Sequence, residues 1–336
     1  MEEKYISKLH PTMDYGAGGF LILIAVVSIT GNAAVLVAAV KKSSRLKPPE
    51  LLSVNLAVTD LGMAVSIYPL AISSAFNHSW LGGDISCIYY GLLGLFFGVA
   101  SIMTLTVMAV VRLILTSTLQ ITANKINKRE IQLAIVCIWL YALVWAILPI
   151  CGCGKYGPEP FGISCTINWS EERNFKKSAF IIPFSVLCVI LPTLTLISCY
   201  SAIAWKHHKA YQASKNNERI LNSNTLEKKL TLMAVMVTAG FLSCWAPYAV
   251  ISFWSIYNSS DNIPPEISVL PCLLAKSSTV YNPLIYYAFS KTFRREIKEL
   301  KCCCLCQIQL LNHAAENELR VRWSGRNNVQ IQPLSE

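Results

Sequence analysis

The hydrophobic positions of this chain gather into seven long apolar stretches separated by polar segments. A bilayer core about 30 Å thick is crossed by roughly 20 mostly apolar residues in a helix. Helices are expected because backbone groups inside lipid must hydrogen-bond to one another. The pattern therefore predicts an all-α membrane protein, a bundle of seven transmembrane helices. The predicted spans are 17–40, 51–76, 86–116, 130–150, 177–205, 228–257 and 266–290.

The polar segments around these spans complete the predicted organisation. Phe293, Ile297 and Leu300 repeat at helical spacing among basic residues, which is typical of a short amphipathic helix on an anionic membrane surface. Cys302 and Cys303 follow it, and we predict that they carry palmitoyl chains that insert into membrane lipid. The predicted parts are an amino terminus (1–16), a seven-span domain (17–290), the amphipathic helix (291–301) and a tail with a cysteine cluster (302–336).

Composition and charge support a membrane protein and exclude other classes. Charged residues make up 14% of the 336 positions and hydrophobic residues 54%, whereas a soluble domain carries about 25% charged residues. The residues behind the net charge of +10 lie in loops. No basic patch is interleaved with aromatic residues, so nucleic-acid binding is not expected. The sequence also contains no recognisable metal cluster, phosphate-binding glycine loop or hydrolase triad.

Lysine and arginine are concentrated after the first, third, fifth and seventh spans, and this excess marks the cytoplasmic side. We therefore predict a multi-pass plasma-membrane protein with its amino terminus outside the cell and its carboxyl terminus inside. Glycosylation sequons begin at Asn77, Asn168 and Asn258, all in loops that this topology places outside. Their common side supports the orientation.

Ionisable side chains inside membrane spans are costly and usually functional, and three stand out: Asp60, Arg112 and Lys276. Lys276 precedes Ser290, at the end of its span, by about 21 Å along the helix, so its amine does not reach the cytoplasm. An amine kept neutral by apolar surroundings is a nucleophile that condenses with an aldehyde to a Schiff base. The alternatives are a lysine paired with a carboxylate or lining an ion path, and position alone does not separate them.

Motifs on the spans carry a resemblance to a known family. They are Gly31-Asn32, Asn55-Leu56-Ala57-Val58-Thr59-Asp60, Trp139 with Pro149, Pro192 with Tyr200, Cys244-Trp245-Ala246-Pro247 and Asn282-Pro283-Leu284-Ile285-Tyr286. In this order they resemble the rhodopsin-like G-protein-coupled receptors over nearly the whole helical part. A lysine six residues before the Asn-Pro pair is the hallmark of the opsins, and Lys276 stands there. The resemblance implies a light-activated receptor that binds retinal, as the 11-cis or the all-trans isomer, through a Schiff base on Lys276.

The resemblance also implies roles for other residues. Trp245 would line the retinal pocket beside the bend that Pro247 makes in span six by removing a backbone hydrogen bond. Asp60 would form a polar cluster with Asn32 and Asn282. The residues expected to act as the activation switch are Asp60, Arg112, Glu227, Pro247, Asn282, Pro283 and Tyr286.

The resemblance also implies a disulfide and a counterion on the outer side of the pocket. Cys87 and Cys165 match the disulfide pair that ties the second outer loop over the pocket in most of the family. Visual pigments of vertebrates have a glutamate counterion at the pocket position that Tyr90 occupies here. Many other opsins use a glutamate six residues before the loop cysteine, which is Glu159 here.

A buried protonated Schiff base needs a negative partner, so Glu159 is the expected counterion. Without such a partner the Schiff base loses its proton, and absorption moves to short wavelengths or the ultraviolet. The combination of Tyr90 with Glu159 resembles the non-visual, neuropsin-like opsins.

One motif departs from the family pattern. The sequence Val111-Arg112-Leu113 stands where the family usually has an acid, an arginine and a tyrosine. The acid normally pairs with the arginine in the resting state, and Glu227 stands where the family often has a second acidic partner. Loss of one partner predicts raised basal activity or weak coupling. The expected partners are a heterotrimeric G protein, with the Gi type favoured by the resemblance, and arrestin.

We expect a receptor and not an enzyme, but two alternatives remain. An opsin that mainly isomerises retinal would bind the all-trans form and release the 11-cis form in light, which retinal extraction before and after illumination detects. A receptor for a diffusible ligand would use Lys276 as pocket wall and would give no new absorption band with retinal.

Overall fold

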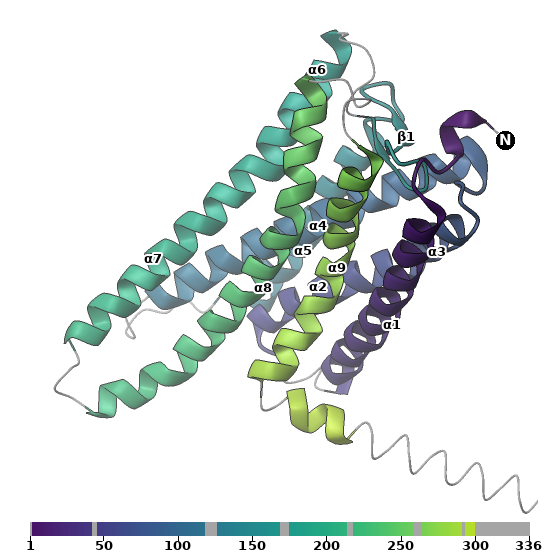
Figure 1. The fold of residues 1–336 in the computed structure, drawn as a ribbon. Helices are drawn as coiled ribbons and strands as arrows, with labels where there is room; N and C mark the ends of the chain where they lie inside the picture. Colours follow the sequence, from purple (N-terminus) through teal and green to yellow (C-terminus); the bar gives the residue numbers. More distant parts are fainter. Residues whose placement is uncertain are drawn as a thin grey trace, which may run out of the picture. The chain divides into compact units, whose positions relative to one another are not determined.

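The structure, a computed structural model, describes residues 2–41, 46–117, 126–168, 175–213, 218–257, 264–290 and 293–299. Its contacts divide the chain into two units, Met1–Phe289 and Ser290–Glu336, which are described separately. The first unit is a bundle of long helices with a two-stranded sheet at the end of the bundle where the chain begins (Figure 1). This end is called the N-terminal end below.

The helices follow the predicted spans in order and in type. They are α1 (Pro11–Lys41), α2 (Pro48–Ser66) with α3 (Tyr68–Phe76), α4 (Gly83–Ser117), α5 (Lys128–Ile147), α6 (Phe175–Phe184) with the π-helical η3 (Ser185–Ile190) and α7 (Leu191–Ala213), α8 (Glu218–Tyr257) and α9 (Pro265–Phe289). Within the described ranges, six of these segments are long and apolar enough to cross a membrane. The seventh, α9, has 25 residues but carries Lys276, Asn282 and a Ser-Ser-Thr run, which lower its mean hydropathy.

Several helix ends differ from the predicted spans. Helix α1 already begins at Pro11, inside the segment predicted as amino terminus, and α7 and α8 continue past the predicted ends at 205 and 228. Hydropathy predicts only the apolar part of a helix, the part that lies in lipid. Backbone hydrogen bonding extends the helix into polar turns on either side, so these helices extend beyond the predicted spans. The second span is interrupted at Ile67 because Pro69, in the first turn of α3, has no N–H to donate.

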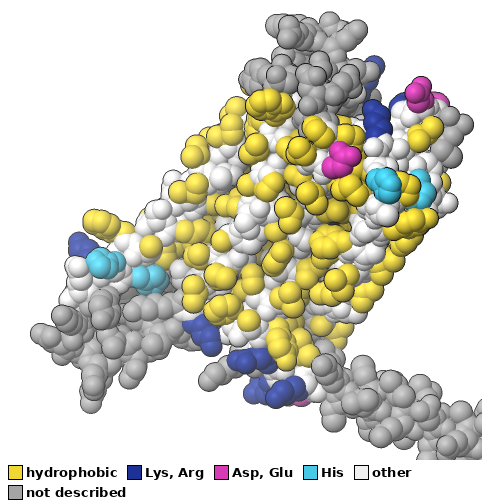
Figure 2. All heavy atoms as spheres, in the orientation of Figure 1, with side chains coloured by type: hydrophobic (Ala, Val, Ile, Leu, Met, Phe, Trp, Pro, Cys, Tyr) yellow, Lys and Arg dark blue, Asp and Glu magenta, His cyan; other side chains and the backbone are white. Residues whose placement is uncertain are grey.

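Helix α4 is the centre of the bundle, because it packs against α2, α5, α7 and both strands. Helix α8 packs along α9, and α1 contacts α2, α3 and α9. Figure 2 shows hydrophobic side chains over the middle of the face in view and charged ones toward its ends. Val40, Leu133 and Val250 are 73%, 65% and 66% exposed. A soluble protein rarely exposes apolar surface so continuously, so this surface suits lipid.

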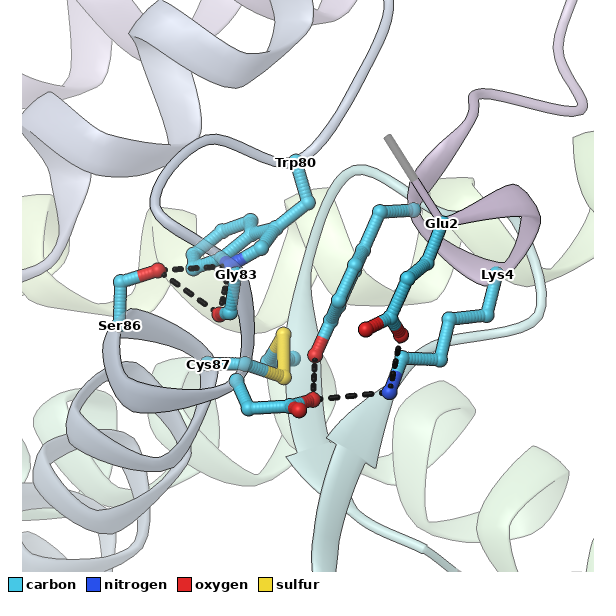
Figure 3. Close-up of polar contacts among 9 residues, drawn as sticks. Glu2, Lys4, Trp80, Gly83, Ser86 and Cys87 are labelled. Carbon is cyan, nitrogen blue, oxygen red and sulfur yellow. Dashed lines mark hydrogen bonds and ion pairs between the residues drawn. A yellow bond between two sulfur atoms is a disulfide. The ribbon is translucent and has the colours of Figure 1, made fainter.

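A small sheet and the start of the chain cover the N-terminal end. Strands β1 (Tyr156–Pro158) and β2 (Cys165–Ile167) are antiparallel, with Tyr156 opposite Ile167. The 3-10 helix η1 (Glu3–Tyr5) lies beside them, and Lys4 Nζ donates to Asp84 Oδ1 of α4 at 2.8 Å (Figure 3). Gly162, at φ +89°, is required here because a Cβ would collide with the Ile6 carbonyl. The turn between the strands therefore fits closely under the amino-terminal segment.

The second unit contains a short helix over residues 293–299, inside the predicted range 291–301. The Ser290 hydroxyl accepts from the Phe293 N–H at 3.1 Å, and Arg295 Nε lies 3.7 Å from Glu299 Oε1 one turn later. Cys302 and Cys303 lie outside the described residues, so their lipidation stays a prediction.

Candidate functional site

Lys276 lies near the middle of α9, and its amine opens onto a cavity inside the bundle. The cavity has a volume of about 180 Å³. Among the described residues that line the cavity, Lys276 and Glu159 are the two with charged side chains. Most of the wall is apolar or glycine and includes Gly94, Gly98, Phe184, Phe241, Trp245 and Ala275. The site therefore combines one amine and one carboxyl group in a water-poor cavity.

A chain of polar contacts connects the two charged groups. Lys276 Nζ donates to Cys272 Sγ at 2.7 Å, and the Cys272 thiol donates to Glu159 Oε1 at 3.5 Å. Cys272 precedes Lys276 by one helical turn, so both side chains lie on one face of α9. The Tyr90 ring centroid lies 5.6 Å from the same amine, a distance suited to a cation–π contact. The structure thus brings together the amine, Glu159 and Tyr90.

Glu159 is fixed by the turn between β1 and β2. Its N–H donates to the Ser164 carbonyl at 2.8 Å, and its carbonyl accepts from the Gly162 N–H at 2.9 Å. The Tyr248 hydroxyl lies 3.4 Å from Glu159 Oε1 and 2.9 Å from Thr166 Oγ1. Burial raises the pKa of the Glu159 carboxyl, and the positive charge of Lys276 opposes that rise. A cation in the cavity therefore favours the ionised form of Glu159.

Cys87 and Cys165 form the predicted disulfide. It joins the first turns of α4 to β2 and so holds the strand pair across the N-terminal mouth of the cavity. The Ser164 hydroxyl, beside this disulfide, donates to the Tyr90 hydroxyl at 3.2 Å. The covalent link and this hydrogen bond keep the turn that carries Glu159 close to α4.

Trp245 of α8 forms the inner wall of the cavity. Its indole N–H donates to Ser278 Oγ of α9 at 3.1 Å, and its ring edge lies 3.4 Å from where a Cβ on Gly98 would stand. The Phe241 and Tyr248 rings lie 5.7 and 6.0 Å from it, centroid to centroid. Trp245 is thus held between α4 and α9, two residues before Pro247.

A polar cluster lies deeper in the bundle than Lys276. Asn282 Nδ2 donates to Asp60 Oδ2 at 2.6 Å, which joins α9 to α2. Asn32 Nδ2 of α1 donates to the Thr279 carbonyl at 3.0 Å, one turn before Asn282. All three side chains are nearly inaccessible to solvent, and burial of polar groups in lipid requires such partners. These bonds join α2 to α9 and α1 to α9; a role of these residues in activation stays a prediction.

The remaining switch residues occupy the half of the bundle away from the N-terminal end. Arg112 is half-buried near the end of α4, and Tyr286 is buried near the end of α9. Pro283 packs against α1, because a Cβ on Gly31 would stand 2.8 Å from its ring. Glu227 lies on α8, but its side chain is outside the described part of the structure. A pairing between Glu227 and Arg112 therefore stays a prediction.

Sequence reasoning missed three groups that contact the amine, Glu159 or Tyr90: Cys272, Tyr248 and Ser164. Cys272 could have been found, because a residue four positions before Lys276 on a helix must lie beside it. Tyr248 and Ser164 reach the site through the packing of α8 and the turn of the sheet. No local pattern in the sequence signals that packing.

The fold and the site define a seven-helix membrane receptor with a central ligand cavity. Residues 31–286 match the family profile described as 7 transmembrane receptor (rhodopsin family). Opsin-5 of Mus musculus is 37% identical over 294 residues, which are 87% of this chain and 78% of that protein. Visual pigment-like receptor peropsin of Homo sapiens is 33% identical, over 84% of this chain and 83% of that protein. The crystal structure of squid rhodopsin matches with a TM-score of 0.81 at 25% identity, over 91% of this chain and 90% of that one.

The chain therefore belongs to the rhodopsin family of seven-transmembrane receptors, and within it to the opsins. The similarity to Opsin-5 and peropsin confirms the predicted resemblance to non-visual opsins. It follows that the protein is a multi-pass membrane receptor and not an enzyme.

Proposed function

We propose that this opsin binds retinal through a Schiff base on Lys276 and activates a heterotrimeric G protein in light. The observation that carries the proposal is that Lys276 is the one amine among the described residues of an apolar cavity wall. The Cys272 thiol joins this amine to the carboxyl group of Glu159. Retinal, when bound, supplies a polyene aldehyde that absorbs light and condenses with an amine. Lys276 fits this group as nucleophile, the apolar walls exclude water, and Glu159 fits as the negative partner of a cation.

The same cavity supports the roles of three neighbouring residues. Glu159 is proposed as the counterion, since it is the one carboxyl group among the described lining residues. Tyr90 offers a neutral ring face to the amine, and Trp245 closes the cavity toward the polar cluster. If Glu159 stays ionised, the receptor absorbs at longer wavelengths. If Glu159 is protonated, absorption shifts to short wavelengths or the ultraviolet.

The topology supports a receptor that lies in the plasma membrane with its amino terminus outside. A disulfide persists in an oxidising compartment, and Cys87–Cys165 lies at the N-terminal end of the bundle. Residues 1–16 would then be extracellular, and residues 291–301 and 302–336 cytoplasmic, with Cys302 and Cys303 as lipidation sites. Gi-type G protein and arrestin are the proposed partners, and 11-cis and all-trans retinal the proposed isomers.

The test is to purify the full chain, add 11-cis or all-trans retinal separately, and record spectra before and after light. We expect a new absorption band that changes on illumination. Borohydride reduction should then fix retinal to the peptide that contains Lys276, as detected by mass spectrometry. Reduction that fixes no retinal, or fixes it elsewhere, overturns the proposal. Retinal extracted before and after light shows whether the receptor chiefly releases isomerised retinal.

Substitution of Gly94 by leucine is expected to weaken retinal binding by about 5- to 150-fold, because an overpacked cavity costs about 1–3 kcal/mol. Gly94 lines the cavity, and a Cβ there would meet nothing within 4 Å. The protein should therefore fold normally while ligand space is lost. Retinal titration of Gly94→Leu measures the effect. Gly19→Leu on α1, where a Cβ also meets nothing within 4 Å, is the matched control, and equal affinities in the two variants would contradict the prediction.

Substitution of Val111 by glutamate is expected to lower G-protein activation in the dark by several-fold. The change restores the acid that the family usually has before the arginine. An ordinary hydrogen bond of this acid to Arg112 would stabilise the resting state by about 1 kcal/mol, which is roughly fivefold in population. Nucleotide exchange on a purified Gi protein, in darkness and in light, measures it. Val111→Gln has the same shape without charge and is the control; equal dark activity in the native chain and both variants rules the idea out.

A further inference from the structure

Cys272 stands between the two charged groups of the site. Its sulfur accepts from Lys276 Nζ at 2.7 Å, and its thiol hydrogen points to Glu159 Oε1 at 3.5 Å. The ion pairs among the described residues do not include Lys276 with Glu159. The shortest described route between the amine and the carboxyl group therefore passes through this thiol, which is 4% exposed.

The surroundings of Cys272 hold it in that place. Ser164 Oγ lies 4.0 Å from Cys272 Sγ and donates to the Tyr90 hydroxyl at 3.2 Å. The Tyr248 hydroxyl contacts the same Glu159 oxygen that the thiol faces. Glu159 is thus approached by a thiol from α9 and a hydroxyl from α8, and the turn of the sheet keeps it in place.

Glu159 also lines a second, larger cavity at the N-terminal end, called the outer cavity below. Its volume is about 700 Å³. Lys4, Lys8, Asp84 and Lys155 contribute to its wall, so it is far more polar than the inner cavity. Cys272 and Lys276 line the inner cavity and not the outer one. The described residues that line both cavities are Glu159, Thr166, Ile167, Tyr248 and Ser252. The thiol therefore lines the inner cavity beside a carboxyl group that borders both cavities.

We infer that Cys272 is a positioning residue, whose thiol couples the Glu159 carboxylate to the Lys276 nitrogen and keeps water from separating them. A thiol suits this position because it donates one hydrogen bond and accepts another, yet is far less hydrated than a hydroxyl or a carboxyl group. The inference deepens the proposed function and rests on it wherever retinal is bound. The bridge itself also exists without retinal and is testable there.

The first test uses the full chain with retinal and measures the pH at which the long-wavelength band is half lost. Cys272→Ala should lower this midpoint by about one to two pH units, because a hydrogen bond to a charged group is removed. Cys272→Ser, which keeps a donor and an acceptor, should restore most of it. Cys199→Ala is the matched control, since Cys199 is a buried free cysteine of α7 that lines neither cavity. A midpoint that is the same in all three variants and the native chain overturns the inference.

The second test needs no retinal. The S–H stretching band of Cys272, identified by its loss in Cys272→Ala, should move to higher frequency in Glu159→Leu, because its hydrogen-bond acceptor is gone. The S–H band of Cys199 should keep its frequency. If the S–H frequency of Cys272 is the same in Glu159→Leu as in the native chain, the thiol does not bond to Glu159 and the inference is wrong. If the native chain forms no retinal band, the proposed function fails, while this infrared result still decides whether the bridge exists.

Discussion

Replacing Lys276 by alanine is expected to abolish the retinal absorption band completely. Alanine removes the one amine in the described wall of the cavity, so no group there can condense with an aldehyde. The fold should persist, since alanine favours helix and the side chain that is lost faces a cavity. Spectra of the purified variant with added retinal, taken with its thermal unfolding, measure both statements. A band of normal intensity in Lys276→Ala would end the light-sensing proposal.

Two further variants test whether the band depends on the nucleophilic amine itself, rather than on its positive charge or on any substitution in this part of α9. Lys276→Arg keeps a positive charge but offers a guanidinium group that does not form a Schiff base at neutral pH, so it should also give no band. Ser277→Ala changes the next residue of α9, whose hydroxyl bonds to Leu274 and faces Cys244 rather than the cavity. It should retain the band. A band in the arginine variant would mean that charge, not condensation, holds the chromophore.

The fold was largely predictable from hydropathy because lipid imposes a simple rule on each crossing. Seven apolar stretches gave the helices in order, and the charges of the loops supplied an orientation. The ends of α1, α7 and α8 were not predictable in this way, since their outer turns are polar and gain their stability from hydrogen bonding and packing. The two strands that carry Glu159 have three residues each, too few for an alternating pattern to be recognised.

The site was predictable where a motif fixes a position in a helix. Lys276, Trp245 and Asn282 follow from the spacing to Pro247 and Pro283. The structure places Trp245 on α8 and the other two on α9. Glu159 came from its offset to Cys165, which depends on the resemblance and not on a physical rule. The contacts that complete the site, from Cys272 and Tyr248, depend on how α8, α9 and the sheet pack together. Such tertiary contacts leave no periodic signal.

Replacing Glu159 by glutamine is expected to move the absorption of the retinal-bound receptor toward the ultraviolet at neutral pH. Breaking a buried charge pair by removing one partner costs about 3–5 kcal/mol, and one pH unit corresponds to about 1.4 kcal/mol. The carboxylate stabilises the protonated nitrogen, so its loss lets the proton leave at lower pH. The pH at which the long-wavelength band is half lost should therefore fall by about two to four units.

A double variant makes this prediction specific to charge. Tyr90 lines the same cavity, with its ring centroid 5.6 Å from Lys276 Nζ. Adding Tyr90→Glu to Glu159→Gln places a carboxylate in the same cavity and should return the midpoint toward that of the native receptor. Tyr90→Gln in the same background, which adds a polar side chain without charge, should not. If the single Glu159→Gln receptor keeps its long-wavelength band over the whole pH range of the native protein, Glu159 is not the counterion. The negative partner would then have to come from solvent ions or from residues outside the described cavity wall.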